Sequence, residues 1–378
     1  MYEMQFDYRG DIKLNKRNFM IDYIKCVATV CVLTLHVGII SGGAFEFYFS
    51  DRTWIFQTPA WSAVWIFFAL SGSLNGTSFF SKKFDFNKQG ILNFYLVRIT
   101  KVLIPTWAFI FIVLCLIDLR AIIDNPIVIV KVLTLRYYNN PAITSIGATW
   151  YVFVLMQLYF ITPLLAYLIE KIMNGKSILF HTTVIALIAA IGLCVRIITF
   201  KAGIAWNAIY VPWYMNLDLY LSGMISAHAC CYQTEYVKTS CIIIVIGLGS
   251  LIVLVVTNTR LFYLANTNSI ATFVCQYVFP TVWLLYVCAY FYIFSKSDFE
   301  PKLFGRIVKK FAAISFYIYL VHSMVANQIA PFVVIESINK RYMCLLILTL
   351  FISMCLGTIM NRASINYSGG KKMNTGNG

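Results

Sequence analysis

Charged residues are scarce in this 378-residue chain, where they make up 12% of the sequence, against roughly 25% in an ordinary soluble domain. Hydrophobic residues make up 60%, and the mean hydropathy is +0.76. A soluble fold of this size has too little interior to bury so much apolar surface. Alternating, period-two segments are also missing, which argues against a bacterial β-barrel. These absences favour a membrane protein made of helices, because a spanning helix bonds its own backbone polar groups.

Metal-binding and redox patterns are missing as well. The eleven cysteines are scattered, mostly inside apolar segments, and no CxxC pair or Cys/His cluster has metal-ligand spacing. A buried cysteine behaves as a small hydrophobic residue, so we expect no metal. The first apolar run contains an acid and a base, which does not suit a signal peptide. No internal repeat is obvious, which weakens the transporter architectures built from repeats.

Ten apolar runs are long enough to span a membrane, since about 20 residues cross a hydrocarbon core of roughly 30 Å. We therefore predict an all-α fold, a polytopic membrane bundle of about ten transmembrane helices. The predicted spans lie near residues 18–41, 59–80, 91–117, 149–169, 177–198, 209–229, 239–257, 270–294, 312–334 and 342–360. The semi-polar segment 120–148 is predicted to be an extracytoplasmic loop with an interfacial helix.

The distribution of lysine and arginine predicts the orientation. With the N-terminus in the cytoplasm, 20 of the 30 basic residues fall inside and 9 outside, while Lys25 lies within a span. This positive-inside bias predicts that both termini are cytoplasmic. It also accounts for the net charge of +15 without a nucleic-acid partner. The expected parts are a cytoplasmic segment, 1–17, a membrane domain, 18–360, and a polar, Gly-rich tail, 361–378, expected to be disordered.

The first predicted span carries Asp22, Lys25 and His36, and ionisable groups inside a membrane usually mark a function. At 100° per residue the three lie within about 60° of one helix face. Asp22 and Lys25 can pair at their spacing of three, and His36 lies about 16 Å beyond Lys25. One interpretation is a structural ion pair and a hydrogen-bonded core histidine. The other makes His36 a general base, because histidine titrates near neutral pH.

The third predicted span begins with two basic residues one turn apart, Arg98 and Lys101. Two cations at this spacing suit a polyanion such as a pyrophosphate. They also suit an anchor that binds lipid headgroups at the inner face. The spacing alone does not decide between these two interpretations.

Other polar and aromatic residues of the spans have structural alternatives. Tyr319 and His322 share one face of the ninth span, as a core pair or as part of a site. Ser71 follows an aromatic run, and small residues there permit close helix packing. Trp150 opens the fourth span, where an aromatic belt is usual. We interpret His181 and His228 as structural, and Asp218 is a weaker functional candidate without an obvious partner.

Five segments, in order from residue 18 to residue 322, resemble the acyltransferase 3 family of bacterial membrane acyltransferases. They are Asn18-Phe19-Met20-Ile21-Asp22-Tyr23-Ile24-Lys25 followed by His36, Phe67-Phe68-Ala69-Leu70-Ser71-Gly72, Arg98-x-x-Lys101 before Pro105, Trp150-Tyr151 with Tyr159 and Pro163, and Tyr319-Leu320-Val321-His322. Lys25 and Lys101 stand where the family usually has arginine, and lysine keeps the charge without the bidentate geometry.

The resemblance implies transfer of an acyl group, commonly acetyl from acetyl-CoA, to a hydroxyl of a surface carbohydrate such as O-antigen, capsule or exopolysaccharide. It implies that His36 is the catalytic base and that Arg98 and Lys101 contact coenzyme A. Supporting roles then fall to Asp22, Lys25, Ser71, Trp150, Tyr319 and His322. The expected location is the bacterial cytoplasmic membrane, and the expected acceptor is a surface glycan or a lipid-linked saccharide.

Two non-enzymatic alternatives stay open. A multi-span carrier or flippase for glycans or small polar solutes predicts a water-lined path with several polar residues per span, and these spans carry few. A membrane sensor or scaffold would not need a pair of cations spaced for a cofactor.

Overall fold

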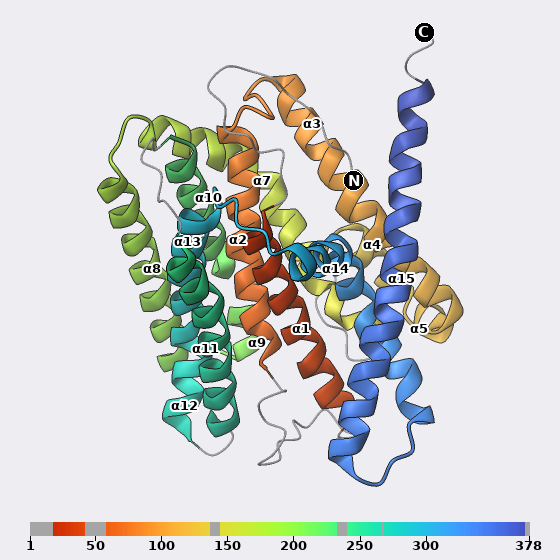
Figure 1. Cartoon of the computed structure of the whole chain (residues 1–378). Coiled ribbons are helices and arrows are strands. Elements are labelled where there is room, and N and C mark those ends of the chain that lie inside the picture. Colours follow the sequence, from red (N-terminus) through yellow and green to blue (C-terminus); the bar gives the residue numbers. More distant parts are fainter. Residues whose placement is uncertain (1–17, 42–57, 137–143, 233–239, 266–267, 375–378) are drawn as a thin grey trace.

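The computed structural model describes residues 18–41, 58–136, 144–232, 240–265 and 268–374, and these residues form helices joined by short connections (Figure 1). The α-helices are α1 (Phe19–Ser41), α2 (Ala60–Phe80), α3 (Lys88–Arg98), α4 (Ile104–Leu116), α5 (Leu119–Asp124), α6 (Ile127–Leu133), α7 (Trp150–Met173), α8 (Ile178–Lys201), α9 (Trp206–Tyr210), α10 (Leu217–Tyr232), α11 (Cys241–Ala265), α12 (Ser269–Phe273), α13 (Phe279–Phe294), α14 (Lys302–Ile329) and α15 (Ile338–Asn374). The π turns are η2 (Ile99–Leu103) and η5 (Val274–Val278), and the 3₁₀ turns are η3 (Thr144–Thr149), η4 (Trp213–Asn216) and η6 (Ala330–Phe332).

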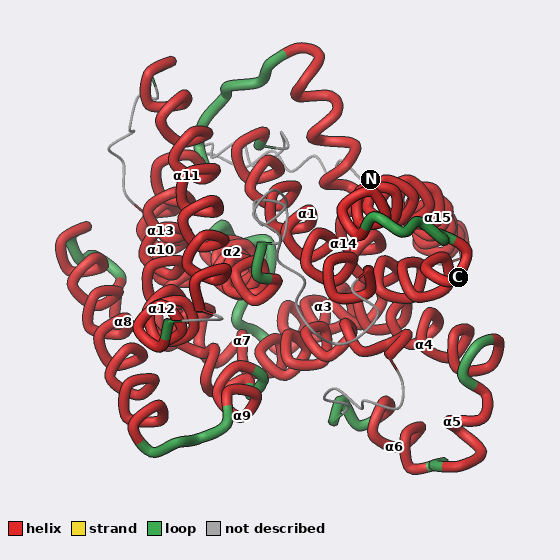
Figure 2. Tube along the Cα trace, turned by 90° about the horizontal axis from the view of Figure 1, so that it is seen from below, coloured by secondary structure: helices red, strands yellow, loops and turns green. Residues whose placement is uncertain are grey.

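Helices α1 and α2 lie in the middle of the bundle. Helices α8, α10, α11 and α13 are on one side of this pair, and α14 and α15 are on the other (Figure 2). The pair also contains several of the largest fully buried side chains, among them Phe19, Met20, Trp65 and Phe68. Residues carried by α1 and α2 are therefore enclosed by helices from both halves of the chain.

Glycines set the distance between α2 and α10. A Cβ atom at Gly72 would collide with the backbone of Tyr220, and one at Gly223 would collide with the backbone of Ala69. The sequence prediction of close packing after the aromatic run of α2 is thus confirmed, because small residues let two backbones approach.

Two prolines coincide with changes of helical geometry. Pro105 follows the π turn η2, and Pro280 follows the π turn η5. Proline lacks an N–H group and its ring collides with the carbonyl four residues earlier, and the wider π turn removes that conflict. The third predicted span is consequently interrupted at Ile99–Leu103, directly after Arg98 and around Lys101.

The prediction of an all-helical, polytopic bundle is confirmed. Eight described helical segments are long and apolar enough to cross a membrane, which makes the chain a multi-pass membrane protein. Two of the ten predicted spans are not among these eight. The sixth predicted span is shorter than expected, because Pro212 precedes the 3₁₀ turn η4 and the α-helix begins only after it. The resulting helix, α10, has 16 residues. The ninth is the helix α14, whose tyrosines, histidine and amides lower its hydropathy.

Two further expectations concern the segments outside the spans. The semi-polar segment after the third span contains the short helices α5 and α6. Its position at the outer membrane interface stays a prediction. Helix α15 extends to Asn374, beyond the predicted end of the membrane domain at residue 360. The segment 1–17 lies outside the described residues.

Candidate active site

Two histidines from opposite ends of the sequence meet inside the bundle. His36 of α1 and His322 of α14 have ring centroids 4.9 Å apart, with the rings tilted by 65°. His322 is fully buried and His36 is partly buried. Sequence reasoning placed each on its own span and gave no sign that they touch. The fold therefore joins the first and ninth predicted spans at their histidines.

The hydrogen bonds of His322 determine which of its nitrogens carries the proton. Nδ1 lies 2.6 Å from the carbonyl oxygen of Tyr319. A carbonyl oxygen only accepts, so Nδ1 must donate, and in the neutral ring Nε2 then holds a lone pair. Nε2 is buried and has no hydrogen-bond partner among the described residues. His322 thus presents an unused acceptor in the interior, where an unpaired polar atom is unfavourable.

Tyr319 holds this part of α14 against the start of α7. Its hydroxyl donates to the carbonyl of Ala148, just before that helix. Its ring lies 5.5 Å from the ring of Tyr151 at a steep angle, and Phe67 of α2 contacts both rings. The backbone carbonyl that orients His322 is therefore fixed by contacts with two other helices.

A line of buried polar groups leads away from the histidines. We name the four tyrosines Tyr151, Tyr159, Tyr220 and Tyr319 the tyrosine row. Ser71 of α2 lies next to both Tyr151 and Tyr159. Farther along, Asn75 donates to the hydroxyl of Tyr220 over 2.9 Å, and that hydroxyl lies 2.7 Å from Thr162 Oγ1. These polar groups come from α2, α7, α10 and α14, and all of them face the interior.

The row ends at the predicted basic pair. The guanidinium of Arg98 lies 5.4 Å from the ring of Tyr159 and 5.0 Å from that of Phe94, in cation–π contact with both. Its Nε is buried and has no hydrogen-bond partner among the described residues. Lys101, in the π turn η2, is exposed. Arg98 and the histidine pair thus lie at the two ends of a row of polar side chains inside the bundle.

The predicted ion pair of the first span is present, with Lys25 Nζ 3.6 Å from Asp22 Oδ1. The pair lies near the start of α1, and His36 is 14 residues beyond Asp22, or about 21 Å along the helix. The three residues share one helix but not one site.

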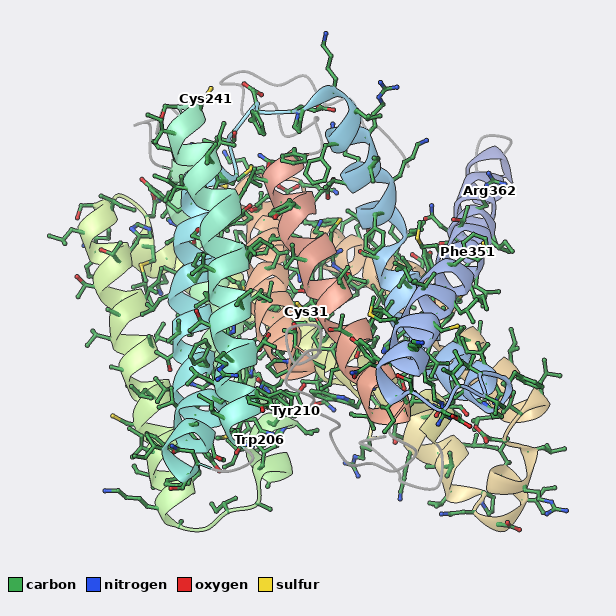
Figure 3. All side chains as sticks on the ribbon, turned by 60° about the horizontal axis from the view of Figure 1, so that its bottom comes forward. Cys31, Trp206, Tyr210, Cys241, Phe351 and Arg362 are labelled. Atoms are coloured by element: carbon green, nitrogen blue, oxygen red, sulfur yellow. The ribbon has the colours of Figure 1, made fainter. Side chains whose placement is uncertain are left out.

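Trp150, the first residue of α7, belongs to a cluster of aromatic rings. Its ring is 4.8 Å from that of Tyr210, which in turn stacks on Trp206 at 5.6 Å. Figure 3 shows Trp206 and Tyr210 next to each other. Trp150 is 8% exposed, so it packs inside an aromatic cluster and not on an outer belt facing lipid.

Comparison with known proteins decides the family. A family model described as an acyltransferase domain matches residues 18–361, which is most of the chain. The chain belongs to the acyltransferase 3 family. No curated protein and no solved structure is significantly similar to it. It is a membrane-bound transferase that uses an acyl donor, and the resemblance seen in the five sequence segments is confirmed.

Other candidates in this acyltransferase find partners away from the histidine pair. Asp218, which has no obvious partner in the sequence, accepts a hydrogen bond from Arg196 at 2.9 Å and forms an ion pair with it at 2.8 Å. Both side chains are mostly buried, so this is an interhelical clamp between α8 and α10. The described residues contain no cluster of three or more side chains that could hold a metal ion.

His181 and His228 are both buried, and they bond to each other. His181 Nε2 lies 2.9 Å from His228 Nδ1, and the other nitrogen of His181 contacts the carbonyl of Ser177. His228 Nε2 faces the carboxylate of Glu170 at 3.4 Å. The acyltransferase therefore holds two histidine pairs, and they differ in one respect. The rings of His181 and His228 are hydrogen-bonded to each other, and the remaining nitrogen of His228 lies beside a carboxylate. The rings of His36 and His322 are in contact, and His322 Nε2 has no acidic neighbour among the described residues.

Proposed function

We propose that this acyltransferase moves an acetyl group from acetyl-CoA to a hydroxyl of a cell-surface carbohydrate, with His36 as the general base. The observation that carries the proposal is the position of His36 beside His322, whose Nε2 is buried and open. A general base needs its ring held in one tautomer and orientation, and a neighbouring acceptor provides both. We propose that His322 Nε2 accepts an N–H of His36 during the reaction, which leaves the other nitrogen of His36 free to take a proton.

The reaction then balances without another reagent. His36 takes the proton of the acceptor hydroxyl as the oxygen attacks the thioester carbonyl carbon. A carbon–oxygen bond forms, the carbon–sulfur bond breaks, and His36 returns the proton to the leaving sulfur. Base catalysis of this kind typically contributes 10²–10⁴-fold to the rate. His322 contacts His36 and not the reacting atoms, so its role is to orient the base.

The donor enters from the opposite end of the bundle. Arg98 and Lys101 bind its phosphate groups, since cations one turn apart match a pyrophosphate. The pantetheine arm follows the interior path of Ser71 and the tyrosine row to the histidine pair. The charge bias of the sequence supports a cytoplasmic position for the end that bears Arg98, where acetyl-CoA is available. It likewise supports a cytoplasmic position for both termini, in a bacterial cytoplasmic membrane. The histidine end then faces outward, toward a surface glycan or a lipid-linked saccharide.

A transfer assay tests the proposal. Purified protein is incubated with radiolabelled acetyl-CoA and with glycan extracted from cells that lack the protein, and the acetylated product is identified by mass analysis. His36→Gln is expected to abolish transfer, whereas His181→Gln, which alters a buried histidine of the other pair, leaves transfer by the folded fraction intact. Unchanged transfer by His36→Gln would refute the base assignment. Neither transfer nor hydrolysis of acetyl-CoA by the wild type would favour the carrier.

A further inference from the structure

A third cation lies beside the basic pair in space, although it is distant from it in sequence. Lys83 belongs to the connection between α2 and α3, and its Nζ lies 5.7 Å from the ring centroid of Phe84. That ring meets the ring of Phe94 edge-on at 5.6 Å, and the guanidinium of Arg98 covers Phe94 at 5.0 Å. Lys83 and Arg98 thus rest on two rings in mutual contact, so one aromatic pair positions both charges.

The connection that carries Lys83 is rigidly built. Lys82 has a φ of 58°, a left-handed conformation that reverses the chain after α2. The backbone N–H of Phe84 donates to the carbonyl of Ser78 over 3.1 Å. A Cβ atom at Gly90 would collide with the backbone of Asp85, so the connection is packed tightly against the start of α3. These contacts fix the position of Lys83 relative to α3, and hence to Arg98.

The three positive charges affect one another. Desolvation and, next, the charges of Arg98 and Lys101 lower the pKa of Lys83. Among the described residues, none of the three cations forms an ion pair with an acidic side chain. The buried Nε of Arg98 also lacks an acceptor there. Cations held together in this way repel one another until an anion joins them, and the side chain of Lys83 has solvent access for one.

We propose that Lys83, Arg98 and Lys101 form one binding site for a ligand with several phosphate groups, the adenosine bisphosphate portion of the acyl-CoA donor. This inference rests on the proposed function and extends its donor site by a residue of another helix connection. Three cations suit such a ligand better than two, because it carries a pyrophosphate and a separate phosphate. The guanidinium of Arg98 supplies a planar, bidentate contact, and the two ammonium groups supply point charges.

Equilibrium binding of radiolabelled acetyl-CoA to the purified full-length protein tests the inference. Lys83→Met keeps the apolar stem of the side chain and removes the charge. It is expected to weaken binding by about tenfold or more, the value of a charge-assisted hydrogen bond. Lys82→Asn is the matched control, since it removes the adjacent charge and asparagine tolerates the left-handed conformation. The control is expected to change affinity by less than about twofold, because Lys82 is not among the three cations of the proposed site and a surface charge outside it contributes little.

Three outcomes separate the possibilities. If the wild type binds acetyl-CoA and Lys83→Met binds it equally well, the inference fails while the proposed function stands. If the wild type does not bind acetyl-CoA at all, both the proposed function and this inference fail. If Lys83→Met changes only the retention of phosphatidylglycerol in mixed-lipid nanodiscs, the phosphate ligand is a lipid headgroup and the inference is overturned. Lys83→Arg, which restores the charge, is expected to bind like the wild type and guards against misfolding of the methionine variant.

The phosphate groups of the ligand can be removed one at a time. Dephospho-coenzyme A lacks the separate phosphate, and pantetheine lacks all of them. If Lys83 contacts the separate phosphate, Lys83→Met should weaken competition by coenzyme A more than competition by dephospho-coenzyme A. Equal dependence assigns Lys83 to the pyrophosphate. Pantetheine is expected to compete equally in the wild type and in Lys83→Met, and a difference there would contradict a phosphate contact.

Discussion

The carbonyl of Tyr319 fixes the tautomer of His322, because a 2.6 Å contact with a carbonyl oxygen requires a proton on Nδ1. If the open Nε2 orients His36, then His322→Gln is expected to lower kcat by about 10²-fold, within the range that base catalysis supplies. The KM for acetyl-CoA should stay within about twofold, since the phosphates bind at the other end. The measurement is steady-state acetyl transfer by the purified variant.

Tyr319→Phe is the control for that prediction. It removes the hydroxyl that bonds to Ala148 but keeps the backbone carbonyl that orients His322. We expect a smaller decrease in kcat than with His322→Gln. A His322→Gln protein with wild-type kcat, or a Tyr319→Phe protein that is more impaired than His322→Gln, would contradict the role of His322.

The clamp of Arg196 and Asp218 predicts a loss of stability without a loss of chemistry. Removal of one partner leaves a buried charge unpaired, which typically costs 3–5 kcal/mol. Asp218→Asn is therefore expected to lower the free energy of unfolding strongly, and the double variant Arg196→Met with Asp218→Leu is expected to recover part of the loss. Unfolding in detergent, followed by circular dichroism, measures both. Equal stability of Asp218→Asn and the wild type would show that the ion pair contributes little.

Two glycines predict opposite effects of the same substitution. Gly72→Ala inserts a Cβ atom into the backbone of α10, whereas a Cβ atom at Gly249 in α11 would meet nothing within 4 Å. We expect Gly72→Ala to destabilise the protein by about 1–3 kcal/mol through overpacking. Gly249→Ala should be neutral or stabilising by up to about 1 kcal/mol, because alanine favours a helix. Thermal unfolding of the two variants compares them directly, and the reverse order would contradict the close approach of α2 and α10.

Much of the helical architecture could be predicted because the membrane imposes it. Long apolar runs must form helices in lipid, so α1, α2, α7 and α8 match the expected segments to within a few residues. Departures occur where proline breaks the backbone pattern. Pro105 signals the π turn beside Lys101, and Pro212 shortens the sixth span. A count of apolar residues alone does not register either interruption.

The site could be predicted only residue by residue. His36, Arg98 and His322 each stand out as polar groups in apolar spans, yet the contact of His36 with His322 joins helices 286 positions apart in the chain. The ion pair between Arg196 of α8 and Asp218 of α10 likewise forms only through tertiary packing. Lys83 gave no signal, because a lysine at the end of a span is the usual positive-inside anchor. Its nearness to Arg98 depends on how the connection folds back, which tertiary packing decides.

The lowered pKa of Lys83 predicts how donor binding responds to pH. A lysine with a lowered pKa loses its proton as the pH rises, before an ordinary lysine with a pKa of about 10.4 does so. The phosphates of the donor are fully charged above about pH 7.5, given a second pKa near 6. As the pH rises, affinity for acetyl-CoA should therefore begin to fall before ordinary lysines lose their protons. The cause is the uncharged amine of Lys83, which no longer attracts the ligand. In Lys83→Arg the guanidinium stays charged, and the decrease should begin at a higher pH. Equilibrium binding measured between roughly pH 7.5 and pH 10 tests this shift, and coincident curves for the wild type and Lys83→Arg would show that Lys83 does not carry the pH dependence.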